Sequence, residues 1–225
     1  MIPIKDKAGF ATLMQSEYNI ASNTAVRLGS VVKLVDDLVV LAAANETGAI
    51  LGIAAENHSG TPDALNQRAN GLKIMVYDSP LSIFAAEATT IIATGESATQ
   101  IISASGFADE DGINALIDND FRGGYVKLLS KSPNSANTDP VGTIYAVSSS
   151  DAGEKSLTIN AAVTAGDRFA LFPPFGFSKG NFDNHRQAVV LTAVAALPLR
   201  VVGRNFNTEK VEYFSGLHAY GNTNS

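Results

Sequence analysis

Short apolar runs separated by turn residues recur along this chain, and they limit its possible folds more than any other feature. Residues 31–35 (VVKLV) and 38–42 (LVVLA) flank Asp36 and Asp37, which predicts a tight hairpin. Runs of about four to eight β-branched and apolar residues between such turns are typical of strands. Further runs occur at 50–54, 72–77, 81–85, 99–103, 125–129, 141–147, 156–159, 168–172, 188–194, 199–202 and 210–214. We therefore expect a mainly β, antiparallel fold.

Helical signals are few. Residues 8–18 carry apolar side chains at helical spacing, namely Phe10, Leu13, Met14 and Tyr18. This stretch is expected to form a short amphipathic helix or a docking arm. Residues 109–117 (DEDGINALI) are expected to form another short helix, because acidic residues in a first turn interact favourably with the helix dipole.

The composition also indicates where the chain divides. Residues 130–140 (SKSPNSANTDP) are dense in Ser, Asn and Pro, so they either join two β domains or form a long hairpin loop within one. The expected division is an N-terminal arm over 1–20, a first β-rich domain over 21–131, and a second β-rich half over 139–225. This second half is either a separate domain or an elaboration of the first. No internal repeat of fixed period is visible.

Charged residues are few and unevenly placed. Of 225 residues, 17% are charged, and none is Cys, which excludes a disulfide-stapled scaffold and a thiol enzyme. Residues 91–120 contain six acidic residues and no Lys or Arg, which accounts for the whole net charge of −6. No basic stripe is present, so we expect no nucleic-acid partner. The acidic segment is expected to be a solvated loop or a surface that meets a basic partner.

No catalytic arrangement is visible in the sequence. His58, His185 and His218 are scattered without ligand spacing, and neither a nucleophile elbow nor a phosphate-binding glycine loop occurs. We therefore expect that the protein is not an enzyme and holds no cofactor.

One constellation has part of the pattern of a calcium-binding loop. With Gly112 at the sixth position, Asp109, Asp111 and Asp118 occupy the third, fifth and twelfth positions. Phe107 then stands first, where a ligand oxygen is needed, and the twelfth residue is Asp instead of the longer Glu. An acidic helix start or an exposed turn accounts for the same residues, so no metal site is assigned.

Membrane and targeting signals are not evident. The longest apolar run, residues 188–199, is shorter than the ~20 residues that a membrane-spanning helix needs. Lys5, Asp6 and Lys7 stand where a signal peptide would be apolar. We expect a protein made in a cytoplasm, without a membrane partner.

The N-terminal pattern resembles the capsid cement, or head decoration, proteins of tailed bacteriophages. The residues that carry the resemblance are NTAVRLGSVVKL (23–34), LVVLAAANETGAILGIAAEN (38–57) and LKIMVYDSPLSIFAA (72–86), with a closing segment LPLRVVGRNFN…EKVEYFSGLHAYG over 197–221. The resemblance implies a small β-barrel or β-tulip fold for 21–131 and no catalysis. It also implies attachment to the major capsid protein on the capsid surface of a virion assembled in a host cytoplasm, often as a homotrimer.

Two segments are candidates for binding a partner. Phe10, Met14 and Tyr18 belong to the expected N-terminal arm, since termini are commonly ordered only when something holds them. The second segment is FPPFGF, whose prolines and glycine exclude an inner strand, with the aromatic residues Phe172, Phe175 and Phe177. These three rings either plug the end of their own barrel or anchor the chain in a partner subunit.

An alternative hypothesis is a fibre or tail module that binds a receptor or a glycan. Sugar sites usually present clustered aromatic side chains beside polar groups. The absence of Trp counts against this hypothesis, whereas Tyr213 and Tyr220 near the C-terminus favour it.

Overall fold

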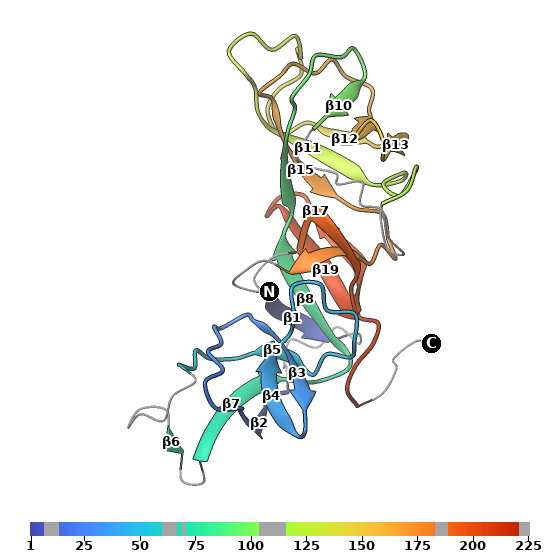
Figure 1. Ribbon diagram of the computed structural model, residues 1–225. Coiled ribbons are helices and arrows are strands. Elements are labelled where there is room, and N and C mark those ends of the chain that lie inside the picture. The colour runs from blue at the N-terminus through green and yellow to red at the C-terminus, as the bar shows by residue number, and fades with distance from the viewer. Residues whose placement is uncertain (7–13, 60–66, 69–70, 104–115, 183–188, 221–225) are drawn as a thin grey trace.

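The computed structural model describes residues 1–6, 14–59, 67–68, 71–103, 116–182 and 189–220. These residues contain nineteen strands in five sheets, all strand pairs are antiparallel, and no helix occurs among them. The predicted mainly β fold is therefore confirmed. Figure 1 shows an elongated body, with the elements from β2 to β7 at one end, those from β10 to β15 at the other, and β1, β8, β17 and β19 between them.

The sheet at the first end begins close to the N-terminus. Its strand order is β2-β7-β5-β3-β4, with β6 attached to β7. The predicted hairpin is present, because β3 and β4 pair directly across Asp36 and Asp37. The strands are β2 (Ser16–Asn19), β3 (Val31–Val35), β4 (Leu38–Leu41), β5 (Gly52–Ala54), β6 (Gln67–Arg68) and β7 (Gly71–Tyr77).

The middle of the body combines strands from both ends of the chain. One sheet has the order β1-β8-β19-β18, and a separate pair joins β16 to β17. The first strand of the chain is therefore held by a strand some eighty residues later, with Ile2 opposite Ala85. The strands are β1 (Ile2–Asp6), β8 (Ser82–Glu87), β16 (Lys179–Phe182), β17 (Val189–Ala196), β18 (Leu199–Asn205) and β19 (Lys210–Ser215).

The other end holds two sheets, with the orders β12-β11-β15-β9 and β10-β14-β13. Since β11 pairs with both β12 and β15, hydrogen-bonded ladders connect residues 21–131 to residues 139–225. Residues 130–140 connect β11 to β12, so this stretch links two paired strands of one sheet. The strands are β9 (Thr89–Ile92), β10 (Gln100–Ile102), β11 (Tyr125–Ser130), β12 (Ile144–Ala146), β13 (Ser149–Asp151), β14 (Ser156–Thr158) and β15 (Arg168–Phe172).

A buried carboxylate organises this β11–β12 connection. Asp167 accepts hydrogen bonds from the Ser132 amide at 2.8 Å, the Ser135 hydroxyl at 2.9 Å and the Thr164 amide at 3.0 Å. A buried charge is tolerated only when hydrogen bonds satisfy it, and three donors do so here. The loop therefore has a fixed conformation, to which its Ser-rich composition contributes the hydroxyl of Ser135.

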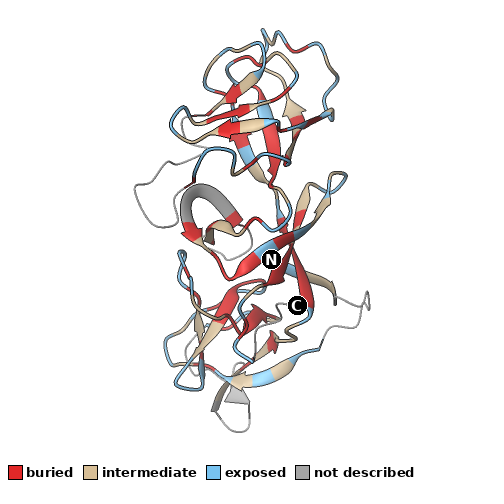
Figure 2. Ribbon diagram, turned by 90° about the vertical axis from the view of Figure 1, so that its right-hand side faces the viewer, coloured by how far each residue is buried: buried red, intermediate tan, exposed pale blue. Residues whose placement is uncertain are grey.

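Two apolar cores lie on opposite faces of the first sheet. Figure 2 shows buried residues along the strands in all parts of the body. Neighbouring residues of β3 divide between them: Val31 packs into the large core that runs through the body, and Val32 packs into a smaller one. Gly52 lets β5 approach β7, because a Cβ at this position would lie 2.0 Å from the Tyr77 carbonyl oxygen. Glycine is thus required here by close backbone approach.

The predicted helix over 8–18 is wrong at its C-terminal end. Ser16–Asn19 forms strand β2 and pairs with β7, and its residues alternate between half-buried and exposed. Hydrogen bonds to the distant strand β7 outweigh the helical spacing of the apolar residues here, because intrinsic helix propensity only weakly determines secondary structure. Phe10 and Leu13 lie outside the described residues, as do residues 109–115 of the other expected helix.

A second buried carboxylate fastens the turn between β4 and β5. Glu46 receives the Lys33 ammonium at 2.6 Å, the Gly48 amide at 2.9 Å and the Ala43 amide at 3.3 Å. Burial raises the pKa of Glu46, but the bond from Lys33 and the two backbone bonds together outweigh burial and hold this pKa below its ordinary value.

We predict that Glu46→Gln lowers the free energy of unfolding at pH 7 by about 1–3 kcal/mol, because it leaves Lys33 without its charged acceptor. The folded-state pKa of Glu46 is depressed, so its contribution is present above about pH 4.5 and is lost as the pH falls through the folded-state value. Urea unfolding of the wild type, Glu46→Gln and the exposed control Glu154→Gln measures this. Equal losses in the two variants would contradict it.

Candidate docking surfaces

The three rings of the FPPFGF segment lie in different environments. Phe172 is fully buried, and Phe177 packs inside the body with its ring centroid 5.1 Å from that of Phe121. Phe175 instead is 66% exposed. Two of the rings therefore serve the chain's own core, and only Phe175 is placed to meet another molecule.

The exposed ring is backed by a fixed cation. The Arg204 guanidinium lies 4.3 Å from the Phe175 ring centroid and 5.0 Å from that of Tyr125. Its Nε donates to the Pro173 carbonyl at 2.9 Å, and its Nη2 donates to the Gly123 carbonyl at 3.4 Å. Burial lowers the pKa of Arg204. In the part of the chain that the structure describes, no carboxylate pairs with this guanidinium.

This stack continues down into the core. Phe206 makes edge contacts with Tyr125 at 5.6 Å and with the buried Phe172 at 4.8 Å. The Lys127 ammonium donates to the Phe206 carbonyl at 3.0 Å, which holds the turn after β18 in place. We call the series Phe172, Phe206, Tyr125, Arg204 and Phe175 the aromatic–arginine ladder. It presents an exposed aromatic ring beside a cation, and both Phe and Arg are enriched in the cores of protein interfaces.

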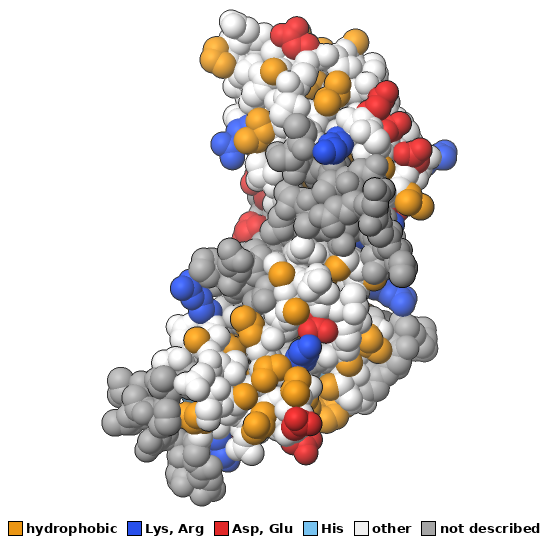
Figure 3. Space-filling view, viewed as in Figure 1, with side chains coloured by type: hydrophobic (Ala, Val, Ile, Leu, Met, Phe, Trp, Pro, Cys, Tyr) orange, Lys and Arg blue, Asp and Glu red, His pale blue; other side chains and the backbone are white. Residues whose placement is uncertain are grey.

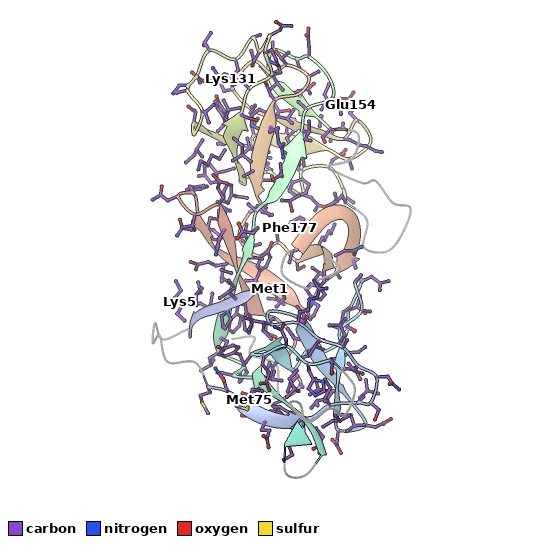
Figure 4. All side chains as sticks on the ribbon, turned by 90° about the vertical axis from the view of Figure 1, so that its left-hand side faces the viewer. Met1, Lys5, Met75, Lys131, Glu154 and Phe177 are labelled. Carbon is purple, nitrogen blue, oxygen red and sulfur yellow. The ribbon has the colours of Figure 1, made fainter. Side chains whose placement is uncertain are left out.

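An apolar groove lies beside the first strand. It has a volume of about 340 Å³, and we call it the N-terminal groove. Its apolar lining is Met1, Ile2, Pro3, Leu28, Tyr77, Ala85 and Ala86, and the ion pair of Lys210 with Glu87, at 3.7 Å, also lines it. Ile2 is 57% exposed and Leu28 is 52% exposed. The Met1 nitrogen donates to the Gly29 carbonyl at 2.9 Å, which ties β1 to the loop before β3. Figure 4 labels Met1 in the middle of the body, between the ends that carry Met75 and Lys131.

The β3–β4 hairpin forms a third exposed surface. Val35 and Leu38 are exposed on either side of Asp36 and Asp37. Both Asp residues adopt positive φ, 50° and 62°, as a tight two-residue turn requires. Figure 3 shows hydrophobic side chains gathered over the lower part of the molecule, where Figure 1 places β3 and β4.

The N-terminal candidates do not form one surface in the described structure. Met14 is exposed, Phe10 lies outside the described residues, and Tyr18 is half-buried on β2. The Tyr18 hydroxyl donates to Asp78 Oδ2, and burial together with this bond raises the pKa of Tyr18 far above its ordinary value. Tyr18 is therefore engaged within the chain.

Part of the acidic segment is also used internally. Asp120 Oδ2 accepts from the Lys179 ammonium at 2.8 Å, and Asp118 Oδ1 accepts from the Ala152 amide at 3.0 Å. The candidate calcium ligands Asp109 and Asp111 fall outside the described residues. Within the described ranges, no group of three or more His, Cys, Asp or Glu side chains is placed to hold a metal ion.

The two C-terminal tyrosines differ sharply in exposure. Tyr213 is buried on β19, whereas Tyr220 is exposed beside the ring of His218. Residues around His218 dock against the first sheet, since the Ala219 amide donates to the Ile50 carbonyl at 2.8 Å. The buried His218 accepts a bond from the Tyr220 amide at its Nδ1, at 3.1 Å.

Sequence reasoning found the ring Phe175 but missed Arg204 and the N-terminal groove. Arg204 follows Phe175 by almost thirty residues, and nothing in its local sequence, VVGRNF, marks it as the partner of an aromatic ring. The groove combines residues from five separate segments. In the sequence, Leu28 looks like an ordinary exposed apolar residue. Only the fold brings it next to the other residues of the groove.

We predict that the C-terminal docking weakens in acid. Burial lowers the pKa of His218 and outweighs the opposing effects of the Leu51 backbone and of Asp78. As the pH falls, His218 is therefore protonated at a higher pH in the unfolded state than in the folded state. The contribution of neutral His218 to the free energy of unfolding is fully present above about pH 6.5 and decreases as the pH falls.

His218→Asn keeps an acceptor for the Tyr220 amide but does not titrate. Its free energy of unfolding should vary less between pH 5 and pH 7 than that of the wild type, as urea titrations at each pH will show. Identical pH profiles for the two proteins would contradict this assignment.

Comparison of the chain with models of known protein families, with curated proteins and with solved structures found no match. No helix in the described ranges is long and apolar enough to cross a membrane.

Proposed function

We propose that this protein is a non-enzymatic structural component of a tailed-phage virion that binds the outer capsid lattice and stabilises it. Its partners are the major capsid protein and further copies of itself, as a homotrimer. The proposal includes no nucleic-acid partner, no membrane partner and no cofactor. The chain is made in the host cytoplasm and ends on the capsid surface. The likeness of residues 23–86 to cement proteins supports this proposal.

The N-terminal groove is the observation that carries the proposal. Uncovered apolar grooves with exposed aliphatic rims are commonly binding sites, because soluble monomers seldom leave such surface open. Ile2 and Leu28 form the exposed rim, and β1 is held firmly by β8 beneath it. A rigid apolar groove of this kind suits an apolar segment of a capsid subunit.

Attachment to a lattice needs only modest affinity at each contact. Copies that are linked to one another bind the shell at several points, so weak individual contacts add up to a long-lived complex. This mechanism accommodates a groove of about 340 Å³, which is too small to hold a protein partner firmly by itself.

We also propose a barrel-like or tulip-like character for the first sheet. Ile20, next to β2, bridges Val39 on the outer strand β4, and the Ala21 amide donates to the Val39 carbonyl at 3.0 Å. These contacts draw the two edge strands together around the smaller core. They favour the barrel that the resemblance implies.

A second candidate function is receptor or glycan binding by a fibre or tail module. The exposed rings of Tyr220 and Phe175 favour it, because sugars pack against such rings. Specific binding on a glycan array, together with failure to bind capsids, would replace the cement proposal with this one.

We predict that Ile2→Asp combined with Leu28→Asp lowers the occupancy of bare capsids at least tenfold, since it places two carboxylates on the apolar rim. Deletion of residues 1–20 is a poorer test, because it removes β1 and β2 from their sheets. Co-sedimentation of the purified chain with capsids measures the occupancy.

Val141→Asp is the matched control, because Val141 is 57% exposed and lies away from the groove, in the loop before β12 at the end of the body that β10 to β15 form. Wild-type occupancy is expected for this variant. If the groove variant also binds at the wild-type level with an unchanged melting temperature, the groove is not the capsid contact.

A further inference from the structure

The Arg204 guanidinium has unused donors in a fixed position. An arginine carries five N–H donors, and the structure gives Arg204 two backbone acceptors, at Pro173 and Gly123. The rings of Phe175 and Tyr125 limit where a further acceptor approaches. A carboxylate is the acceptor that matches a planar guanidinium best, because both of its oxygens can be engaged at once.

The chain itself carries an acidic turn of matching character. Asp36 and Asp37 are exposed, and neither takes part in an ion pair with any described residue. Their positive φ values make this a turn for which Asn-Gly is the preferred sequence. Asp is one of the few residues besides Gly and Asn that adopt positive φ readily, so the turn geometry admits these two residues but does not itself select a charged pair over Asn-Gly.

The flanks of this turn are apolar, as the surroundings of Arg204 are. Val35 and Leu38 are exposed directly beside the two carboxylates, and Phe175 is exposed directly beside the guanidinium. Two other acidic residues, Asp120 and Glu209, are already paired with Lys179 and Lys127 within the chain. The acidic turn and the aromatic–arginine ladder therefore carry opposite charges, and each has exposed apolar side chains beside its charge.

We propose that Arg204, Tyr125 and Phe175 form a carboxylate-binding site whose occupant is the Asp36–Asp37 turn of a second copy of this chain. A carboxylate of the turn accepts from the free Nη donors of Arg204, and Val35 and Leu38 pack against Phe175. This inference rests on the self-association that forms part of the proposed function.

The two surfaces belong to different parts of one copy. The turn lies on the hairpin at one end of the body (Figure 1), and Arg204 lies on β18 in the middle sheet. Each copy therefore gives one turn and receives another, which is a head-to-tail contact. Such contacts form closed rings when the rotation between neighbours closes, and a homotrimer is a ring of this kind.

Charge reversal tests the contact. Native mass spectrometry and light scattering would compare the wild type, Arg204→Glu, the pair Asp36→Arg with Asp37→Arg, and a triple variant with all three changes. We expect an oligomeric wild type, at least tenfold weaker association in the first two variants, and restored association in the triple variant, where Glu meets Arg again.

Two further sets of variants separate folding from binding. Asp36→Asn with Asp37→Gly suits the turn geometry but removes the charges, so it should lose association without a lower melting temperature. The exposed controls Arg168→Glu and Glu154→Arg should associate like the wild type.

The outcomes distinguish this inference from the proposed function. An oligomer that Asp36→Asn with Asp37→Gly leaves intact, or a triple variant that stays monomeric, overturns the turn-to-arginine contact alone. A wild type that remains monomeric at every concentration overturns the proposed self-association, and the contact with it.

Discussion

Strands β3 and β5 bury side chains on both of their faces, and the rest of the structure depends on this constraint. Val31 and Ile53 point into the large core, while Val32 and Ala54 point into the smaller one. The large core continues through the middle sheet to the far end of the body. A sheet with two apolar faces must be covered on both sides, so the first sheet cannot separate from the middle one without exposing core residues.

This shared core also fixes the relation between the candidate surfaces. Phe172, at the base of the aromatic–arginine ladder, belongs to the same core as Met1, which lines the N-terminal groove. Ladder and groove are therefore presented by one packed body instead of by flexible appendages. Rigid presentation favours binding, because little conformational freedom is lost when a partner arrives.

Local patterns were sufficient to predict thirteen of the nineteen described strands and the hairpin. The run VVKLV-DD-LVVL contains its own strand period and its own turn, so β3 and β4 follow from neighbouring residues. Two of the missed strands pair with distant strands: Ser16–Asn19 carries helical spacing but pairs with β7, and residues 2–6, expected to belong to the N-terminal arm, pair with β8 about eighty residues later. The missed strands β13 and β16 instead pair with the next strand in the chain, and their polar sequences lack an apolar run.

The candidate site was predictable to the same limited extent. Phe175 stood out because prolines and a glycine place its ring in a loop, which is a local property. Its exposure beside Arg204 is not local, since β18 reaches it only through the folded middle sheet. The composition of residues 130–140 likewise predicted a loop. It did not predict that the buried Asp167, from a distant segment, accepts the hydrogen bonds that hold this loop.

We propose that this body sits on a capsid lattice and contacts both the shell and its own neighbours. Electron cryo-microscopy of bare capsids mixed with the purified chain tests it most directly. We expect elongated density on the outer surface, with the N-terminal groove facing the shell and the β3–β4 hairpin reaching β18 of an adjacent copy. Capsids without added density, or density that meets the shell through the end formed by β10 to β14, would contradict it.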